Sequence, residues 1–354
     1  MKRRWRTSME RLKPYFDDLL RADEARESMS LYDDELGDAA SCCTTAEVAA
    51  FYVAIGRLTG DDVTAIAAGL AKDVAERQLP EGGFPQPYYV KKGESGTIDI
   101  AEIGAAANAL YHVHRATGSE HAKAALLRSA AYLLTQVAKE NPGAVYKNPN
   151  AAGHDVLNGD IYAAHTFGRA YELTGDRTYA DQAERIVRHV AERFGKHAPG
   201  WWPYIENWDG SVGMGNSVAY QGTILAFAHT LLPILSKETA ERWRGVEREA
   251  AETMLSAMDV GPNDDNEAPW WCRDWNNAWE IALGLWRVKD RLPAAAARCE
   301  RRVQEVEAEL ERLGAAAFRP KVRQEDKERT PVTTTFRKAA TFAGIAAYIV
   351  LDEE

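Results

Sequence analysis

Two kinds of segment alternate along this chain, and their alternation is the feature that most limits its possible folds. One kind is apolar on nearly every side, which is typical of a helix that is buried all round. The other kind is apolar on one face only, at spacings of three and four, which is typical of a helix with one wet face. Residues 217–235 show the first pattern and residues 177–195 show the second.

The two kinds of segment recur at regular intervals. The buried kind begins near residues 44, 99, 160, 217, 276 and 333, and the one-sided kind begins near residues 3, 62, 120, 177, 237 and 293. A repeat of about 55 to 60 residues is typical of solenoids and closed arrays. We therefore predict an all-α (α/α)6 toroid, with six inner and six outer helices in a single domain over residues 1–354.

The ends of the array decide between a ring and an open α-solenoid. Outer helix 3–22 and inner helix 333–350 each lack a partner, and a ring closes if they lie side by side. An open array would expose an apolar inner helix, so we favour the ring. No apolar alternation long enough for a sheet is present, and residues 23–43 are interpreted only as a polar segment. Thr44 or Thr45 is expected to cap the helix that follows, with Glu47 in capping-box range.

Composition excludes several classes of partner. The chain has 354 residues and a net charge of −10, which argues against binding the phosphate backbone of nucleic acids. No apolar run reaches the ~20 residues of a membrane span, and the N-terminus has no apolar core of a signal peptide. We therefore expect a cytoplasmic protein. The cysteines are too few for a disulfide framework; Cys42 and Cys43 are either a redox or metal pair, or two small buried residues.

The loops that lead into the inner helices are long, whereas the turns that leave them are short. All the long loops must then lie on one face, at the N-terminal ends of the inner helices. Loops of this length in a compact domain usually carry function, and the helix dipoles favour anionic groups at that face. We therefore expect the functional site there.

The long-loop face supplies acidic side chains and a histidine, the residue types that acid–base chemistry on sugars requires. The candidate catalytic residues are Asp99, Glu102, His154, Asp155, Asp160, Glu206 and Asp209. Asp99 and Glu102 lie one helical turn apart and can share a face. The alternative is that Asp99 and Glu102 form a capping box and that Asp160 only caps its own helix.

Aromatic and polar side chains on the same face are candidates for binding a substrate. The stretch 200–221 is rich in tryptophan and glycine, and sugar rings stack on exposed aromatic faces; the alternative is an aromatic plug over the ring. The candidate binding residues are Tyr88, Lys147, Asn148, Trp201, Trp202, Tyr204, Trp208, Asn216, Tyr220, Trp271, Arg273 and Trp275. Asp264, Asp265 and Glu267 could hold Ca²⁺ or form a solvated acidic loop. No metal, phosphate-loop or nucleophile-elbow motif is present, so we predict no metal and no cofactor.

Two local resemblances point to carbohydrate-active toroids. The segment DGSVGMGNSVAYQGTILAFAHTLLPIL (Asp209–Leu235) is similar to a segment of the hyaluronate and chondroitin lyases, but Gly215 and Ile224 stand where those lyases have their catalytic histidine and tyrosine. The segment QLPEGGFPQPYY (Gln78–Tyr89), followed by TIDIAEIGAA, resembles a pectate-lyase toroid and also the glutamine–tryptophan repeats of terpene cyclases. Helical toroids of this kind look like unsaturated glucuronyl hydrolases, uronate epimerases and several polysaccharide lyases.

These observations predict a carbohydrate-active enzyme, a glycoside hydrolase or a lyase. It would act on an oligosaccharide, with uronate-containing chains among the candidates. Carboxylates would supply the acid and the base, and aromatic residues would form the subsites. The alternatives are a terpene-cyclase-like enzyme and a non-catalytic binding or scaffold toroid.

Overall fold

A computed structural model describes residues 2–24, 27–89, 99–149, 152–260, 278–320 and 333–352. These residues contain twelve α-helices, three 3-10 helices and six short strands. Contacts divide the chain into two compact units, one of residues Met1–Ser129 with Arg301–Glu354 and one of residues Ala130–Glu300. In the described parts of the chain, no helix has the length and apolar character that crossing a membrane requires.

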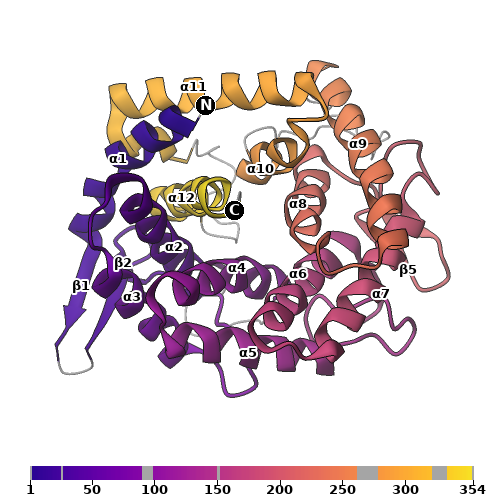
Figure 1. Cartoon of the computed structure of the whole chain (residues 1–354), viewed down its shortest axis with the longest axis horizontal. Coiled ribbons are helices and arrows are strands. Elements are labelled where there is room, and N and C mark those ends of the chain that lie inside the picture. The colour runs from indigo at the N-terminus through magenta and orange to yellow at the C-terminus, as the bar shows by residue number, and fades with distance from the viewer. Residues whose placement is uncertain are drawn as a thin grey trace. The chain divides into compact units, whose positions relative to one another are not determined.

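The first unit is built around helices that are buried almost all round. Its helices are α1 (Lys2–Leu19), α2 (Cys42–Thr59), α3 (Thr64–Arg77), α4 (Ile100–Thr117) and α12 (Thr335–Leu351), with parts of α5 (Glu120–Thr135) and α11 (Pro293–Leu313). Helix α2 contacts α3, α4 and α12 (Figure 1). Every residue of α2 from Cys42 to Ile55 is buried, as expected for an inner helix. Helix α1 contacts α2 and α12, and it buries Trp5, Met9, Leu12 and Phe16 completely.

The second unit is likewise built around helices that are buried almost all round. Its helices are α6 (Leu157–Thr174), α7 (Arg177–Arg193), α8 (Val218–Ala228), α9 (Lys237–Val260) and α10 (Trp279–Val288). Helix α8 contacts α6, α9 and α10 (Figure 1), and all its residues except Tyr220 are buried. Helix α7 buries one face, which includes Ala183, Ile186 and Val190, as the one-sided pattern of residues 177–195 predicted. The 3-10 helix η2 (His229–Leu231) follows α8 directly, so the regular inner helix is shorter than the predicted 217–235.

Two small antiparallel sheets correct the expectation that the chain has none. Strands β1 (Leu20–Asp23), β2 (Ser28–Asp33) and β3 (Asp38–Ala39) form one sheet, and β4 (His154–Val156), β5 (Ile205–Asn207) and β6 (Val212–Met214) form the other. The predicted helix 3–22 therefore ends at Leu19, and the segment 23–43 is not a simple loop. Strands of two to six residues are too short for an alternating pattern to reveal them.

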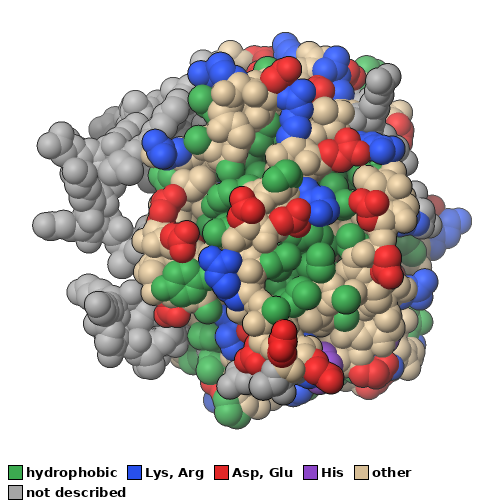
Figure 2. Space-filling model, turned by 90° about the vertical axis from the view of Figure 1, so that its left-hand side faces the viewer, with side chains coloured by type: hydrophobic (Ala, Val, Ile, Leu, Met, Phe, Trp, Pro, Cys, Tyr) green, Lys and Arg blue, Asp and Glu red, His purple; other side chains and the backbone are tan. Residues whose placement is uncertain are grey.

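The first sheet lies against helix α3. Strand β2 contacts α3, and a Cβ at Gly69 of α3 would stand only 3.1 Å from the Met29 side chain. Figure 2 shows the side of the molecule that lies at the left of Figure 1, where β1 and β2 are. Acidic and basic side chains are interspersed there around a patch of hydrophobic ones.

Short side chains set the starts of the inner helices. Ser41, rather than Thr44 or Thr45, caps α2, because its hydroxyl accepts a hydrogen bond from the Thr44 amide. Asp99 caps α4, in agreement with the alternative that it is a capping residue, with its Oδ1 2.9 Å from the Ala101 amide nitrogen. The alternative that Asp160 caps α6 is wrong, because α6 begins earlier and its N-cap, Val156, makes no side-chain hydrogen bond. At the opposite ends, Gly60, Gly118 and Gly175 adopt positive φ angles of 85°, 71° and 72°, which is how the predicted short turns leave the helices.

Candidate functional site

A buried polar cluster lies at the N-terminal ends of α2, α4 and α12 in the first unit. Asp33, at the end of β2, links two other segments of the cluster. Its Oδ2 accepts hydrogen bonds from the Tyr88 hydroxyl, at 2.9 Å, and from the Thr334 hydroxyl, at 2.6 Å. Tyr88 belongs to the 3-10 helix η1 (Pro87–Tyr89), and Thr334 is the N-cap of α12. The cluster is therefore assembled from segments far apart in the sequence.

Glu102 is the acidic group at the centre of this cluster. It lies in the first turn of α4 with 7% of its surface exposed, and its Oε2 has no hydrogen-bond partner among the described residues. Burial raises the pKa of Glu102 and the charge of Asp99 raises it further, whereas Arg337 and hydrogen bonds from Ser41 and Gln86 oppose the shift. A carboxyl group whose pKa is raised in this way can hold a proton and deliver it as a general acid.

Tyr88 and Arg337 form the other side of the cluster. The Arg337 guanidinium carbon lies 4.8 Å from the centre of the Tyr88 ring, within the range of a cation–π contact. Burial, followed by the charge of Asp33 and the hydrogen bond to it, raises the pKa of Tyr88. Tyr88 therefore keeps its proton and acts as a hydrogen-bond donor, rather than as a phenolate base.

The sequence predicted part of this cluster and missed the rest. Asp99, Glu102 and Tyr88 were among the candidates. Arg337 and Asp33 were not. A signal for Arg337 was present, because a basic residue in the first turn of a helix opposes the helix dipole. Such a residue indicates that anionic partners lie nearby.

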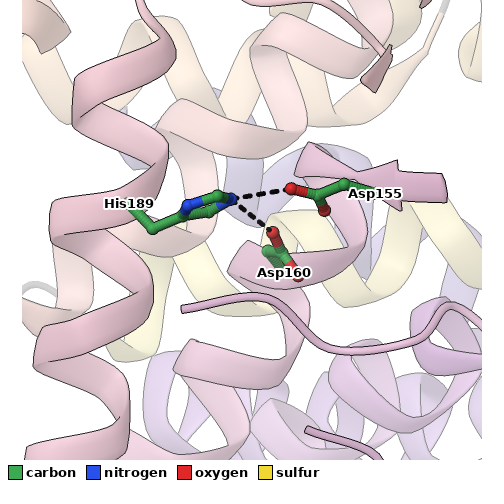
Figure 3. A group of neighbouring side chains, drawn as sticks. All are labelled: Asp155, Asp160 and His189. Atoms are coloured by element: carbon green, nitrogen blue, oxygen red, sulfur yellow. Dashed lines mark hydrogen bonds and ion pairs between the residues drawn. The ribbon is translucent and has the colours of Figure 1, made fainter. Parts of the chain in front are cut away.

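A second cluster lies in the other unit, where Asp155 on β4, Asp160 on α6 and His189 on α7 point toward one another (Figure 3). His189 Nε2 lies 2.7 Å from Asp155 Oδ2 and 3.8 Å from Asp160 Oδ2. Asp160 Oδ1 accepts a hydrogen bond of 2.7 Å from the Val145 amide. Burial first, and then Asp155, raise the pKa of Asp160 well above its ordinary value.

The ligand-type atoms of Asp155, Asp160 and His189 all lie within 4.8 Å of one another, the spacing that a metal ion needs. The second ring nitrogen of His189 does not fit that role. His189 Nδ1 lies 3.0 Å from the amide nitrogen of Asn141, whereas a metal-bound imidazole donates its other N–H to an acceptor. The group is therefore better suited to hold a proton than a metal.

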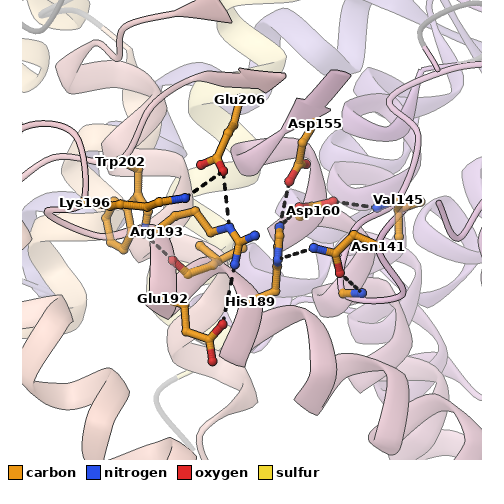
Figure 4. A network of polar contacts seen from close by, with 12 residues as sticks. Asn141, Val145, Asp155, Asp160, His189, Glu192, Arg193, Lys196, Trp202 and Glu206 are labelled. Carbon is orange, nitrogen blue, oxygen red and sulfur yellow. Dashed lines mark hydrogen bonds and ion pairs between the residues drawn. The ribbon is translucent and has the colours of Figure 1, made fainter. Parts of the chain in front are cut away.

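Glu206 is the centre of a salt-bridge network beside this cluster (Figure 4). It stands opposite Asp155 in the pairing of β4 with β5 and is 4% exposed. Its carboxylate lies 3.2 Å from Lys196 Nζ, 3.4 Å from His197 Nε2 and 3.8 Å from Arg193 Nε. This environment fits a structural ion pair better than a proton donor.

The two remaining acid–base candidates of the second unit are His154 and Asp209. His154 begins β4, where its partner across the sheet is Asn207. Asp209 is exposed, and its Oδ1 accepts hydrogen bonds from both the amide and the hydroxyl of Ser211, which lower the pKa of Asp209. Asp209 thus stabilises a turn.

The expectation that Trp201 and Trp202 are exposed is wrong. Trp201 is 2% exposed and Trp202 is completely buried. The Trp202 indole N–H donates a hydrogen bond to the Val190 carbonyl at 2.8 Å, and its ring centre lies 4.6 Å from that of Phe194 and 5.8 Å from that of Trp243. These tryptophans belong to the core. Residue type alone could not separate this role from a sugar-binding one.

Other predicted binding residues form a partly exposed group in the second unit. The Tyr204 and Tyr220 rings stack with centres 4.2 Å apart, and Lys147 Nζ lies 3.1 Å from the Tyr204 hydroxyl. Trp208 and Asn148 are half-buried. Asn216 is buried and accepts a hydrogen bond from the Ser217 amide. The predicted residues Trp271, Arg273 and Trp275, and the acidic residues Asp264, Asp265 and Glu267, lie outside the described residues.

Solved structures of sugar-acting enzymes resemble the chain over almost its whole length. A cellobiose 2-epimerase from Bacillus thermoamylovorans aligns with 98% of this chain and 98% of its own, with a TM-score of 0.68 and 12% identity. A D-mannose isomerase aligns with 98% of this chain and 96% of its own, with a TM-score of 0.65 and 11% identity. An unsaturated glucuronyl hydrolase specific for heparin aligns with 98% of this chain and 96% of its own, with a TM-score of 0.60 and 14% identity. No protein-family model and no curated protein sequence matches the chain.

These similar structures are (α/α)6-toroid carbohydrate-active enzymes. The chain therefore has the all-α (α/α)6 toroid fold that the sequence predicted. At 11% to 14% identity the likeness shows the fold alone. The roles of individual residues and the single-domain organisation stay predictions.

Proposed function

We propose that this protein is a carbohydrate-active enzyme and that Glu102 is its general acid. The observation that carries the proposal is the state of Glu102: a buried carboxyl with a raised pKa and an oxygen, Oε2, that has no hydrogen-bond partner among the described residues. Glu102 lies at the N-terminal end of an inner helix, on the face where the long loops were expected to place the site. The solved structures that share the fold act on sugars, which supports the class of substrate.

Glycoside hydrolysis is the reaction that this cluster fits best. The leaving-group oxygen must receive a proton as the glycosidic bond breaks, and a second carboxylate then activates water or attacks the sugar. Glu102 would supply the proton. Asp99 is the proposed second carboxylate, because it lies close enough for its charge to raise the pKa of Glu102. Arg337, whose charge also acts on Glu102, could bind a uronate carboxylate, so acidic oligosaccharides are the first substrates to try.

Epimerisation or isomerisation of a sugar is the second candidate. Two of the similar structures are a cellobiose 2-epimerase and a D-mannose isomerase. In such a reaction Glu102 would protonate the carbonyl oxygen while a base removes the proton of the neighbouring carbon, and return of a proton to carbon would complete the isomerisation. Neither these two structures nor the glucuronyl hydrolase is a terpene cyclase, so that alternative gains no support.

The test compares Glu102→Gln with the wild type on neutral and uronate-containing oligosaccharides labelled at the reducing end. Loss of a general acid is expected to lower kcat by about 10² to 10⁴. The control is Glu120→Gln, which removes an exposed carboxylate from the first turn of α5 and should leave the rate unchanged. Full activity of a folded Glu102→Gln protein would overturn the assignment.

The products identify the reaction. Shorter saturated products indicate hydrolysis, and a product with a new double bond indicates elimination. A product of unchanged mass but different chromatographic mobility indicates epimerisation or isomerisation.

A further inference from the structure

The cluster of Asp155, Asp160 and His189 places two buried carboxyl groups close together, and something must balance their negative charges. These three residues are 3%, 0% and 5% exposed. Two carboxylates this close and this deeply buried cannot both stay ionised unless a cation or a proton lies between them. The candidates are a protonated His189, a metal ion, or a proton on the carboxylates themselves.

The hydrogen bonds of Asn141 exclude a protonated His189. The Gly143 amide donates to Asn141 Oδ1 at 2.8 Å, so the Asn141 NH₂ group is the one that faces His189 Nδ1, at 3.0 Å. An amide NH₂ group can only donate, so Nδ1 must accept. The ring proton is therefore on Nε2, which donates to Asp155 Oδ2 at 2.7 Å (Figure 4). His189 is a neutral imidazole in this arrangement.

The same bonds argue against a metal ion. A metal bound at Nε2 would move the ring proton to Nδ1, where it would meet the Asn141 NH₂ group. The side-chain amide of Asn141 cannot flip to present its oxygen to His189, because the flip would break the hydrogen bond from the Gly143 amide to Asn141 Oδ1. Gly143 itself is fixed against His189, since a Cβ at this glycine would lie only 2.6 Å from the His189 Cβ.

Two carboxylate oxygens remain without a partner among the described residues. Asp160 Oδ1 accepts a hydrogen bond from the Val145 amide, and Asp155 Oδ2 accepts one from His189. Asp155 Oδ1 and Asp160 Oδ2 are buried, and within the described segments neither has a hydrogen-bond partner. A single proton between these two oxygens would satisfy both of them.

We propose that Asp155 Oδ1 and Asp160 Oδ2 share one proton, and that this proton locks strand β4 onto helices α6 and α7. The raised pKa of Asp160, caused first by burial and then by Asp155, agrees with this arrangement. Because the proton is part of the folded structure, the lock is sensitive to pH. The contact of β4 with α6 and α7 is stable while the proton is bound. Loss of the proton destabilises the contact, because two buried negative charges would then face each other.

The other charged groups around the pair are already engaged. Arg193 on α7 lowers the pKa of Asp160 in part, but its Nε lies 3.8 Å from Glu206 on β5. Lys196 also pairs with Glu206 (Figure 4), and His197 Nε2 lies 3.4 Å from the same carboxylate. Arg193 Nη1 also lies 3.5 Å from Glu192 Oε2. Glu206 and Glu192 therefore offset the charges of Arg193 and Lys196, and the proton remains as the counter-charge of the Asp155–Asp160 pair.

The first test is the replacement Asp160→Asn, which imitates the protonated carboxyl. The asparagine oxygen can still accept from Val145, and its NH₂ group can donate to Asp155 Oδ1. Folding of the wild type takes up a proton at any pH between the ordinary carboxyl pKa and the raised pKa. Its unfolding constant should therefore rise, relative to that of Asp160→Asn, by about tenfold per pH unit in this window.

The measurement is urea unfolding of both proteins from pH 5 to pH 9. The matched control is Asp181→Asn, which removes an exposed carboxylate of α7 that is paired with Arg177 and should run parallel to the wild type. If Asp160→Asn fails to fold, Asp155→Asn serves instead, because its oxygen can accept from His189 while its NH₂ group donates to Asp160 Oδ2. Parallel pH profiles for the wild type and the folded variant would overturn the proposal.

The second test observes His189 in the wild type. Nitrogen-15 NMR of labelled histidines at pH 7 should show one ring in the neutral Nε2–H form, and this signal should be absent from His189→Gln. An imidazolium form of His189 at this pH would overturn the proposal. One equivalent of tightly bound metal in the purified protein, released by Asp160→Asn, would overturn it as well.

Discussion

The guanidinium of Arg337 lies 4.8 Å from the centre of the Tyr88 ring, and Tyr88 in turn donates a hydrogen bond to Asp33. Arg337 occupies the first turn of α12, where the positive end of the helix dipole disfavours a cation. The aromatic face and the neighbouring carboxylates offset this cost. The positive charge is thus held beside Glu102, where it opposes the effect of burial on the pKa of that group.

Replacing Arg337 should change how the activity depends on pH. If Glu102 is the general acid, activity is lost as pH rises through its pKa. Arg337→Gln removes a charge that lowers the pKa of Glu102, so the alkaline limb of kcat/KM should move upward by about one pH unit. Arg337→Lys keeps the charge and should restore most of the wild-type profile. An alkaline limb that stays in place in Arg337→Gln would show that another group controls it.

Two tryptophans from the same stretch should behave differently. Trp202 is completely buried, so Trp202→Ala should lower the free energy of unfolding by about 3 to 5 kcal/mol. Trp208 is half-buried and donates one hydrogen bond to the Ala152 carbonyl. Trp208→Ala should cost less stability and raise KM for an oligosaccharide if this side chain forms a subsite. Urea unfolding and steady-state kinetics check both expectations, and equal losses of stability would contradict them.

Helices α8 and α10 approach so closely that a methyl group does not fit between them. A Cβ at Gly284 of α10 would lie 2.7 Å from the Gly222 carbonyl oxygen of α8. Because this neighbour is backbone, Gly284→Ala should destabilise the protein by about 1 to 3 kcal/mol. The control is Gly245→Ala on α9, where a Cβ meets nothing within 4 Å. Alanine at this position should raise the free energy of unfolding by about 0.5 to 1 kcal/mol. Thermal unfolding of the two variants should therefore shift in opposite directions.

The sequence predicted the helices because each inner or outer helix repeats its apolar pattern over several turns. It could not predict the sheets, because β4 has only three residues. The candidate site was predicted in part for a similar reason. Asp99 and Glu102 lie one turn apart on one helix, whereas the hydrogen bond from Thr334 to Asp33 joins residues 301 positions apart. Contacts of that kind depend on the tertiary packing of the helices, which a local pattern does not specify.

Asp99 can be both a helix cap and a catalytic carboxylate, and two substitutions separate these roles. Its Oδ1 accepts a hydrogen bond from the Ala101 amide at 2.9 Å. Asparagine caps about as well as aspartate, whereas alanine in that position costs about 0.5 to 2 kcal/mol. Asp99→Asn should therefore keep the stability that Asp99→Ala loses. If the carboxylate takes part in the reaction, both variants should lose activity.

The same substitution also tests the electrostatics of the cluster. The charge of Asp99 raises the pKa of Glu102, so any residual activity of Asp99→Asn should lose its alkaline limb at a lower pH than the wild type. This shift is opposite in sign to the one expected for Arg337→Gln. Shifts in the same direction would mean that the limb does not report Glu102, whereas a fully active and stable Asp99→Asn would leave Asp99 as a cap alone.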